Sequence, residues 1–309
     1  MPDKVGIMLQ TTIRNSINCT GTGLHSGETV RMCLRPAPAA TGIVFVRTDL
    51  ERRIAKVPAM WDLVTETTLG TTLTNEHGVS IATVEHLMSA LAGAGIDNVF
   101  VELDGPEVPI MDGSSAPFLF LIDCAGIRRQ ESPRTAIEIL DTVRVEDGDK
   151  WVTLEPADRF EVSFSIDFPT PVIASQSFEL VVNEASYKAE LARARTFGFA
   201  PEVDYLRSRG LARGGSLDNA VVIDGDRVLN EGGLRFEDEF VRHKALDAVG
   251  DLYLAGAPIL GRYTGHKAGH ALNNRLLRRL FAEADAWRMV PMTQTPLRTA
   301  APAFAAVAL

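Results

Sequence analysis

The most regular run of apolar positions along the chain lies at residues 81–92. Its apolar side chains recur at intervals of three and four residues, as on the buried face of a helix: Val84, Leu87, Met88 and Leu91. Gly93 and Gly95 follow directly and predict the end of this helix. Residues 98–103 are rich in apolar and β-branched side chains, which predicts a strand.

A second helical pattern covers residues 242–251, and a glycine and a proline a few residues further on predict its end. Because positions four apart lie one above the other on a helix, His243 and Asp247 project together and Asp251 extends their row. An imidazole and a carboxylate stacked in this way can hold a divalent metal, but a solvated helix face shows the same spacing. The row alone leaves both interpretations open.

The rest of the chain continues the alternation of strands and helices. Strand-like stretches occupy residues 136–140, 150–154 and 160–168, and a further apolar helix is predicted at about 269–286. Both halves therefore show strands followed by an apolar helix, although no residue-level repeat is visible.

The length of 309 residues exceeds the usual size of a single core and predicts two domains. The polar segment 128–134, which contains a proline, is the expected linker between domains at 1–128 and 134–300. An alanine-rich tail at 301–309 is expected to be frayed.

Composition narrows the class of protein. The net charge of -9 argues against non-specific nucleic-acid binding, which needs a basic surface. Three scattered cysteines without C-x-x-C spacing indicate a reducing compartment and no disulfide framework. No window reaches the roughly 18 apolar residues of a membrane span, and no secretory signal is evident. We expect a cytoplasmic protein, and a monomer, because no exposed heptad pattern is present.

In the first half of the chain, Glu85 and His86 are the residues whose side chains suit catalysis. Zinc hydrolases need three protein ligands, an open coordination position and a base near the bound water. His86, His243 and Asp247 could supply the ligands and Glu85 the base. A solvent-exposed pair at the start of a helix would explain Glu85 and His86 equally well.

A third polar segment, GHKAGHALNN, lies at residues 265–274. A histidine such as His270 could act as a general acid, and Asp251, if close, would favour its protonated form. An anion-tolerant helix start without catalysis is the alternative. His25, in a turn-rich stretch without P-loop spacing, is expected to be structural, and Asp112 to be a turn carboxylate.

Four motifs together resemble one family closely: TVEHL at 83–87, RTFGF at 195–199, RFEDEFVRHK at 235–244 and GHALNN at 269–274. They are similar to the signatures of UDP-3-O-acyl-N-acetylglucosamine deacetylase, a zinc amidase of lipid A synthesis in Gram-negative bacteria. The resemblance runs from about residue 10 to 290.

The resemblance implies an α+β fold of two domains of similar architecture, each a β-sheet layered against helices, with the active site between them. It also implies a small β insert within residues 48–76 and a βαβ insert at about 196–224. The second insert would form a passage for the acyl chain of the substrate.

The resemblance also assigns roles to individual residues. One Zn²⁺ ion would be held by His86, His243 and Asp247. Glu85 would be the general base, Thr196 would stabilise the oxyanion, and His270, oriented by Asp251, would protonate the leaving amine, with Lys244 contacting the substrate. Phe168 and Lys267 would hold the uridine and the diphosphate. The acyl passage would be lined by Leu24, Leu69, Phe197, Phe199, Ala220 and Val222.

Two other functions remain compatible with the sequence. A non-haem iron oxygenase could use the same two histidines and one carboxylate, although it needs neither Glu85 nor His270. A non-catalytic protein that binds nucleotide sugars or lipids could share the fold, and loss of the base or of a ligand would be its mark.

Overall fold

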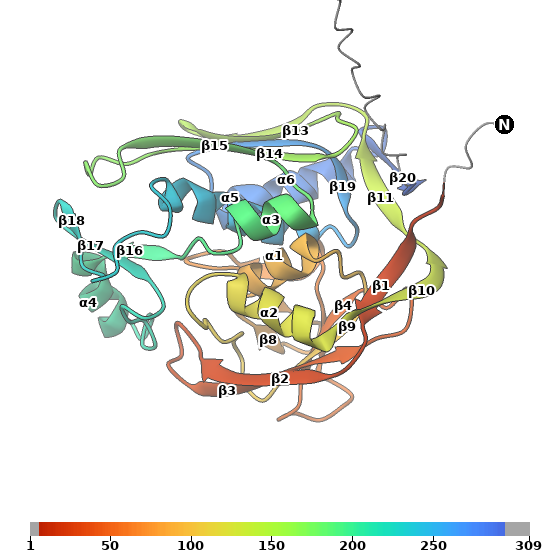
Figure 1. Cartoon of the computed structure of the whole chain (residues 1–309), viewed down its shortest axis with the longest axis horizontal. Helices are drawn as coiled ribbons and strands as arrows, with labels where there is room; N and C mark the ends of the chain where they lie inside the picture. Colours follow the sequence, from red (N-terminus) through yellow and green to blue (C-terminus); the bar gives the residue numbers. More distant parts are fainter. Residues whose placement is uncertain (1–5, 294–309) are drawn as a thin grey trace, which may run out of the picture.

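Two β-sheets with helices between them form the body of the protein (Figure 1). The computed structural model describes residues 6–293. The five strands of the first sheet pair in the order β2-β3-β9-β4-β5: β2 (Ile17–Thr22), β3 (Thr29–Pro36), β4 (Ile43–Arg47), β5 (Lys56–Pro58) and β9 (Val99–Leu103). This mixed architecture confirms the predicted α+β class, whereas the predicted tail at 301–309 lies outside the described residues.

The second sheet has seven strands, centred on β19. It is formed by β11 (Thr135–Ile139), β12 (Val143–Asp147), β13 (Lys150–Glu155), β14 (Phe160–Asp167), β15 (Ser175–Val181), β19 (Ile259–His266) and β20 (Trp287–Pro291). The strands predicted at 136–140, 150–154 and 160–168 are therefore confirmed with small shifts of their ends.

The two sheets arise from the same order of elements along the chain. In the first half, β2 to β5 precede α1 (Glu85–Gly93), β9 and α2 (Ala116–Ala125). In the second half, β12 to β15 precede α5 (Glu239–Tyr253), β19 and α6 (His270–Ala282). In each half the strand that follows α1 or α5, which is β9 or β19, lies antiparallel to β3 or β13 and parallel to β4 or β14. The chain thus repeats one topology that its residues do not reveal.

Each half carries an insert. The first insert lies between β5 and α1, and the second lies between β15 and α5. The first is a 3-10 turn and a small antiparallel sheet: η1 (Trp61–Leu63), β6 (Val64–Glu66), β7 (Thr72–Thr74) and β8 (Ser80–Ile81). The second contains α3 (Glu184–Glu190), β16 (Phe197–Phe199), α4 (Ala200–Ser208), β17 (Val221–Asp224) and β18 (Arg227–Val228). Because β16 and β17 pair in parallel, this segment includes a βαβ unit where the sequence predicted one.

The segment predicted as a linker, 128–134, is a strand instead. β10 (Ile127–Pro133) pairs antiparallel with β1 (Leu9–Ile13). Although its sequence is polar, its backbone therefore forms a ladder of hydrogen bonds with β1. Next along the chain, Arg134 donates from Nε to Asp97 Oδ1 at 2.8 Å. The connection between the halves is therefore a hydrogen-bonded strand, which the polar sequence of this segment did not predict.

The first predicted helix begins at Glu85, four residues later than expected. Ser80 and Ile81 belong to β8, and Thr83 has a φ of 57°, a left-handed conformation through which a right-handed helix cannot run. The Thr83 hydroxyl donates to Glu107 Oε1 at 3.0 Å, which holds this unusual backbone in place. The other predicted helices are confirmed. None in the described part of the chain is long and apolar enough to cross a membrane.

Helices α1 and α5 pack against each other in the middle layer (Figure 1). They approach so closely at Gly250 that a Cβ atom there would lie 2.1 Å from the carbonyl oxygen of Glu85. Across the same contact the Ser89 hydroxyl donates to the Leu246 carbonyl at 2.7 Å, and Tyr187 donates to Ser89 at 2.7 Å. The crossing therefore depends on a residue without a side chain.

Gly250→Ala should destabilise the protein despite the higher helix propensity of alanine. The propensity gain is about 1 kcal/mol, whereas overpacking a buried contact costs about 1–3 kcal/mol and displaces the start of α1. We expect a lower Tm in thermal unfolding. Gly232→Ala is the matched control, because a Cβ there would meet no atom within 4 Å. A Tm equal to or above that of the parent protein would contradict the importance of this contact.

Candidate active site

Three buried side chains converge where α1 begins and α5 passes it. The nitrogen and oxygen atoms that His86, His243 and Asp247 can offer to a metal lie within 4.8 Å of one another. Asp247 Oδ1 is 3.5 Å from His86 Nε2 and 3.4 Å from His243 Nε2. All three residues are at most 5% exposed, so the interpretation of His243 and Asp247 as a solvated helix face is wrong.

The protonation states of this group suit a metal. Burial lowers the pKa of His243 to about 4, which leaves a neutral imidazole. His243 Nδ1 donates to the Ala194 carbonyl at 3.1 Å, so Nε2 is the nitrogen with a free lone pair. Burial opposes ionisation of Asp247, but the two histidines hold its pKa below the ordinary value.

Two polar atoms of the group are buried without a hydrogen bond from any described residue: Asp247 Oδ1 and His86 Nδ1. Burying a carboxylate oxygen without a partner is costly, and a cation between the three residues would remove that cost. Two imidazoles and one carboxylate form a donor set that zinc accepts in a tetrahedral site with one open position. The residues present therefore fit a catalytic zinc ion.

Glu85 lies beside this group and is also buried, which excludes an exposed pair at the helix start. Its Oε2 accepts a hydrogen bond from the Thr71 backbone at 3.0 Å, and its Oε1 lies 3.9 Å from His270 Nε2. Burial raises the pKa of Glu85, which makes this carboxylate a better proton acceptor near neutral pH.

His270, the first residue of α6, is held by Asp251 from α5. Its Nδ1 lies 2.8 Å from Asp251 Oδ2. Burial disfavours the charged ring, but the Asp251 carboxylate outweighs burial and raises the pKa of His270 to about 9. His270 is therefore protonated at neutral pH, with its Nε2 directed toward Glu85.

Two residues that sequence reasoning missed complete the environment of Asp251. The Thr71 hydroxyl donates to Oδ1 at 2.6 Å, and Asn273 Nδ2 donates to Oδ2 at 2.8 Å. Asn273 lies within the GHALNN motif and could have been noticed there. Thr71 carries no local signal, because it reaches the site only through the fold of the first insert.

The segment that contains Thr196 runs along the same side of α5. Its neighbour Ala194 accepts the hydrogen bond of His243, and the Phe197 ring lies 6.4 Å from the His243 ring. The Thr196 backbone donates to the Gly113 carbonyl at 2.8 Å. Lys244 is also near, with Nζ 3.8 Å from Asp247 Oδ2.

The residues expected to contact substrate form two groups. Phe168 packs against the rings of Phe197 and Phe199, with centroids 5.9 and 6.0 Å apart. On the other side, the carbonyl of Leu69, which is 46% exposed, lies 3.2 Å from His25 Nε2.

The remaining predicted contacts lie in the loop after β2, on the second insert or near the end of β19. The Leu24 carbonyl accepts from the Gly214 backbone at 3.0 Å. Ala220 and Val222 are both hydrogen-bonded to the Asn230 side chain. Lys267 is ion-paired with Asp149 and Asp167, each at 3.1 Å. Its charge is therefore already shared with two exposed carboxylates.

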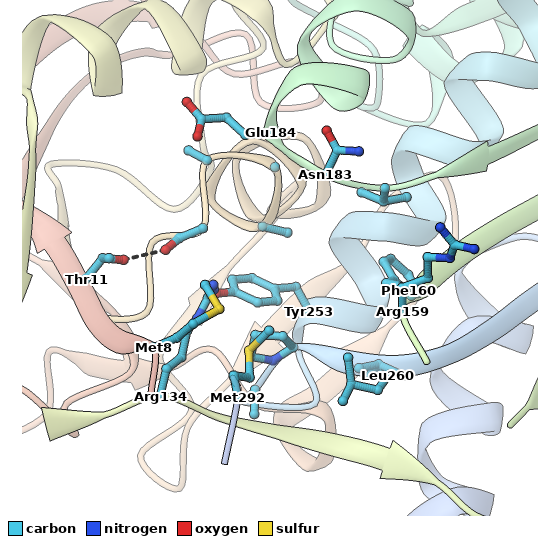
Figure 2. Close-up of a pocket in the computed structure, with 18 of the residues that line it drawn as sticks. Met8, Thr11, Arg134, Arg159, Phe160, Asn183, Glu184, Tyr253, Leu260 and Met292 are labelled. Carbon is cyan, nitrogen blue, oxygen red and sulfur yellow. Dashed lines mark hydrogen bonds between the residues drawn. The ribbon is translucent and has the colours of Figure 1, made fainter. Parts of the chain in front are cut away.

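A cavity of about 960 Å³ lies on another side of the α1–α5 pair (Figure 2). It is bounded by the carboxyl ends of these helices and by segments from both halves, including Met8, Arg134, Phe160, Tyr253 and Met292. None of the predicted site residues lines it. The candidate chemistry is therefore concentrated in the buried group and not in this cavity.

The fold and the site define an α+β protein with a buried group of two histidines and one aspartate, of the kind that holds a catalytic divalent metal. The family model described as LpxC, UDP-3-O-acyl N-acetylglycosamine deacetylase, matches residues 10–282. The chain belongs to this family.

Curated relatives carry the same name. A UDP-3-O-acyl-N-acetylglucosamine deacetylase from Acidithiobacillus ferrooxidans is 58% identical over 283 residues, which cover 91% of this chain and 92% of that protein. A deacetylase of the same name from Shewanella sediminis is 51% identical over 305 residues, covering 97% and 99% of the two chains.

Zinc should stabilise the metal-free protein against heat, because it binds a site that only the folded state offers. A ligand at 1,000 times its Kd stabilises by about 4 kcal/mol, which calorimetry or fluorescence would record as a higher Tm. Asp247→Asn should lose most of this zinc-induced rise. Asp104→Asn, at an exposed ion pair with Arg31, is the control and should keep it. An undiminished rise in Asp247→Asn would rule out the proposed ligand set.

Proposed function

We propose that this chain removes the N-acetyl group from UDP-3-O-acyl-N-acetylglucosamine, giving UDP-3-O-acyl-glucosamine and acetate in lipid A biosynthesis. The observation that carries the proposal is the buried group of His86, His243 and Asp247 with Glu85 and His270 facing each other beside it. The names of its relatives give the substrate class.

His86, His243 and Asp247 would hold one Zn²⁺ ion. When bound, zinc supplies Lewis acidity toward the amide carbonyl and lowers the pKa of a water molecule. The burial of the three residues excludes bulk solvent, which strengthens every electrostatic interaction at the site.

Glu85 and His270 divide the two proton transfers of amide hydrolysis. The Glu85 carboxylate takes a proton from the water that attacks the carbonyl carbon. As the carbon–nitrogen bond breaks, His270 Nε2 gives a proton to the leaving amine. Asp251, bonded to Nδ1, keeps Nε2 directed at the reacting atoms. Burial raises the pKa of Glu85, which suits a base, and Asp251 raises the pKa of His270, which keeps the acid protonated.

Thr196 and Lys244 act on the substrate. The Thr196 hydroxyl stabilises the negative oxygen of the tetrahedral intermediate, and the Lys244 ammonium contacts the substrate near the metal ligands. Both roles follow from the family motifs. Two observations support them: Lys244 follows His243 on α5, and Thr196 lies two residues after Ala194, whose carbonyl accepts from His243.

Residues of the two inserts, of the loop after β2 and of the ends of β14 and β19 provide the substrate contacts in this proposal. Phe168, Phe197 and Phe199 form an aromatic wall, and Lys267 binds the diphosphate by exchanging Asp149 and Asp167 for phosphate oxygens. The second insert forms the acyl passage, which is lined by Leu24, Leu69, Phe197, Phe199, Ala220 and Val222. The halves at 1–128 and 134–300 act as two domains with the site between them.

We further infer that the protein works as a cytoplasmic monomer. Its three cysteines are free thiols, which suits a reducing compartment. An iron oxygenase and a non-catalytic binding protein are not favoured, because neither has a use for the buried pair of Glu85 and His270.

The proposed reaction can be tested directly. Zinc-loaded protein should release acetate from UDP-3-O-acyl-N-acetylglucosamine, and a zinc chelator should stop the release. Glu85→Gln should reduce kcat by about 100-fold or more, since a general base contributes roughly 10²–10⁴-fold. The assay should run equally well without oxygen. Oxygen-dependent turnover, or no acetate release by zinc-loaded protein, would overturn the proposal.

The rate should fall in alkaline solution as His270 loses its proton. Because its pKa is raised to about 9, kcat/KM should decline as pH rises through that value. Asp251→Asn removes the charge that raises this pKa, so the decline should begin at lower pH. A pH–rate profile of both proteins measures the shift, with Asp104→Asn as control. An unmoved alkaline limb in Asp251→Asn would show that another group controls it.

A further inference from the structure

A fully buried carboxylate, Glu239, lies one turn before His243 on α5. It accepts from Arg195 Nε at 2.9 Å, from Arg195 Nη2 at 3.1 Å and from the Arg195 backbone at 2.9 Å. The Arg235 backbone donates at 2.6 Å to Glu239 Oε2, the oxygen that also accepts from Arg195 Nη2. Four donors around one buried carboxylate form a strong, geometrically fixed contact. None of the roles assigned above uses it.

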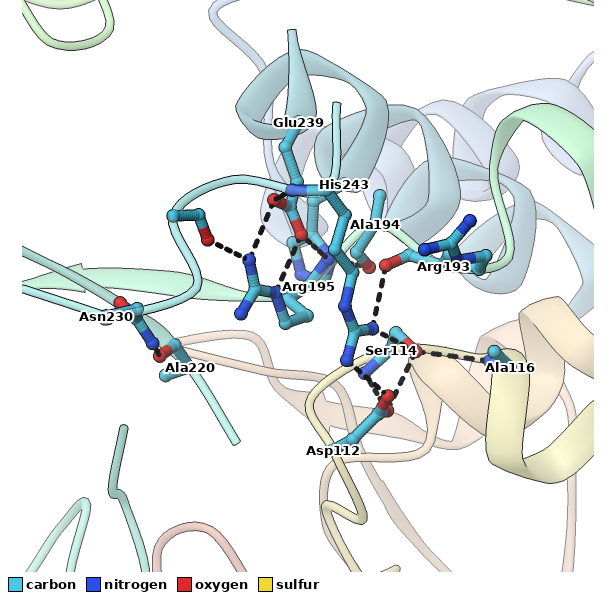
Figure 3. A network of polar contacts seen from close by, with 12 residues as sticks. Asp112, Ser114, Ala116, Arg193, Ala194, Arg195, Ala220, Asn230, Glu239 and His243 are labelled. Atoms are coloured by element: carbon cyan, nitrogen blue, oxygen red, sulfur yellow. Dashed lines mark hydrogen bonds and ion pairs between the residues drawn. The ribbon is translucent and has the colours of Figure 1, made fainter. Parts of the chain in front are cut away.

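The position of this contact gives it a consequence for the metal ligand. Arg195 lies between Ala194, whose carbonyl accepts the Nδ1–H of His243, and Thr196. Figure 3 shows the Arg195 guanidinium against Glu239, with Ala194 and His243 beside it. Because Glu239 binds the backbone of Arg195 as well as its side chain, it fixes the peptide that orients His243. The same contact fixes the residue before Thr196.

The network of polar contacts continues from the second half of the chain into the first half. Arg235 Nη2 lies 2.9 Å from Asp112 Oδ2, and its Nη1 donates to the Arg193 carbonyl at 3.0 Å. Asp112 Oδ1 in turn accepts from the backbone and the hydroxyl of Ser114. The next residue, Ser115, donates to the His86 carbonyl at 2.8 Å. One chain of polar contacts therefore connects the supports of both ligand histidines.

The backbone around this network leaves little room to adjust. Gly113 has a φ of 83°, and a Cβ there would lie 2.0 Å from the Asn219 carbonyl oxygen. The Gly113 carbonyl also accepts from the Thr196 backbone at 2.8 Å. A displacement of either loop would therefore be passed to the other.

We propose that Glu239 and Arg235 are positioning residues that hold the two histidines in register for the metal, through Arg195 and Ala194 on one side and Asp112 and Ser115 on the other. Neither residue has a hydrogen bond or ion pair to the donor atoms of the metal ligands. Outer contacts of this kind change metal affinity by about 10–100-fold when removed. The proposal rests on the zinc site proposed above.

The test uses the full chain with Glu239→Gln and Arg235→Met. Zinc affinity is measured by competition with a chromogenic chelator, and the ligand geometry by the visible spectrum of the cobalt-substituted protein. Both variants should bind zinc about 10–100-fold more weakly and show a changed cobalt spectrum. In the acetate-release assay kcat should fall while KM stays close to that of the parent protein.

Glu102→Gln and Arg35→Met are the matched controls, because Arg35 and Glu102 form an ion pair of the same chemistry between exposed positions of β3 and β9. Both controls should keep parent affinity and spectrum. A lower Tm with unchanged affinity and spectrum in Glu239→Gln and Arg235→Met would reduce the network to a structural role and overturn the proposal. If the parent protein itself takes up no zinc, the metal site fails and this proposal fails with it.

Discussion

The close crossing of α1 and α5 is the constraint on which the rest of the structure depends. At Gly250 the two backbones come so near that no side chain fits between them. Glu85 and His86 begin α1 at this point, while His243 and Asp247 occupy the preceding turns of α5. The distance between helices therefore fixes the distance between ligands, and small residues at the contact are needed for the chemistry beside it.

The crossing also buries several ionisable groups in one place, which would be costly if any remained unpaired. Asp251 is matched by His270, Thr71 and Asn273, and Glu85 by the Thr71 backbone. Within this crossing, only the group of His86, His243 and Asp247 keeps buried polar atoms without partners; the other two such atoms among the described residues, His25 Nδ1 and Trp287 Nε1, lie outside it. The exception coincides with the place where a cation fits.

Sequence reasoning succeeded where periodicity controls geometry. The spacing of His243, Asp247 and Asp251 on one helix placed them in a single row, and the strand and helix patterns gave the α+β class. It failed where distant segments decide. Thr71 and Asp112 meet the site through tertiary contacts, and the ladder with β1 turned the polar segment 128–134 into a strand. The start of α1 depends on the left-handed backbone conformation of Thr83, which no sequence pattern predicts.

The pairing of β1 with β10 has a consequence for ligand binding. β10 is bonded to β1, the Arg134 backbone is bonded to Met8 and Met292, and its side chain to Asp97. A tether fastened at so many points resists hinge bending, so the buried group of His86, His243 and Asp247 is preorganised. Binding energy is then not consumed in closing the two halves.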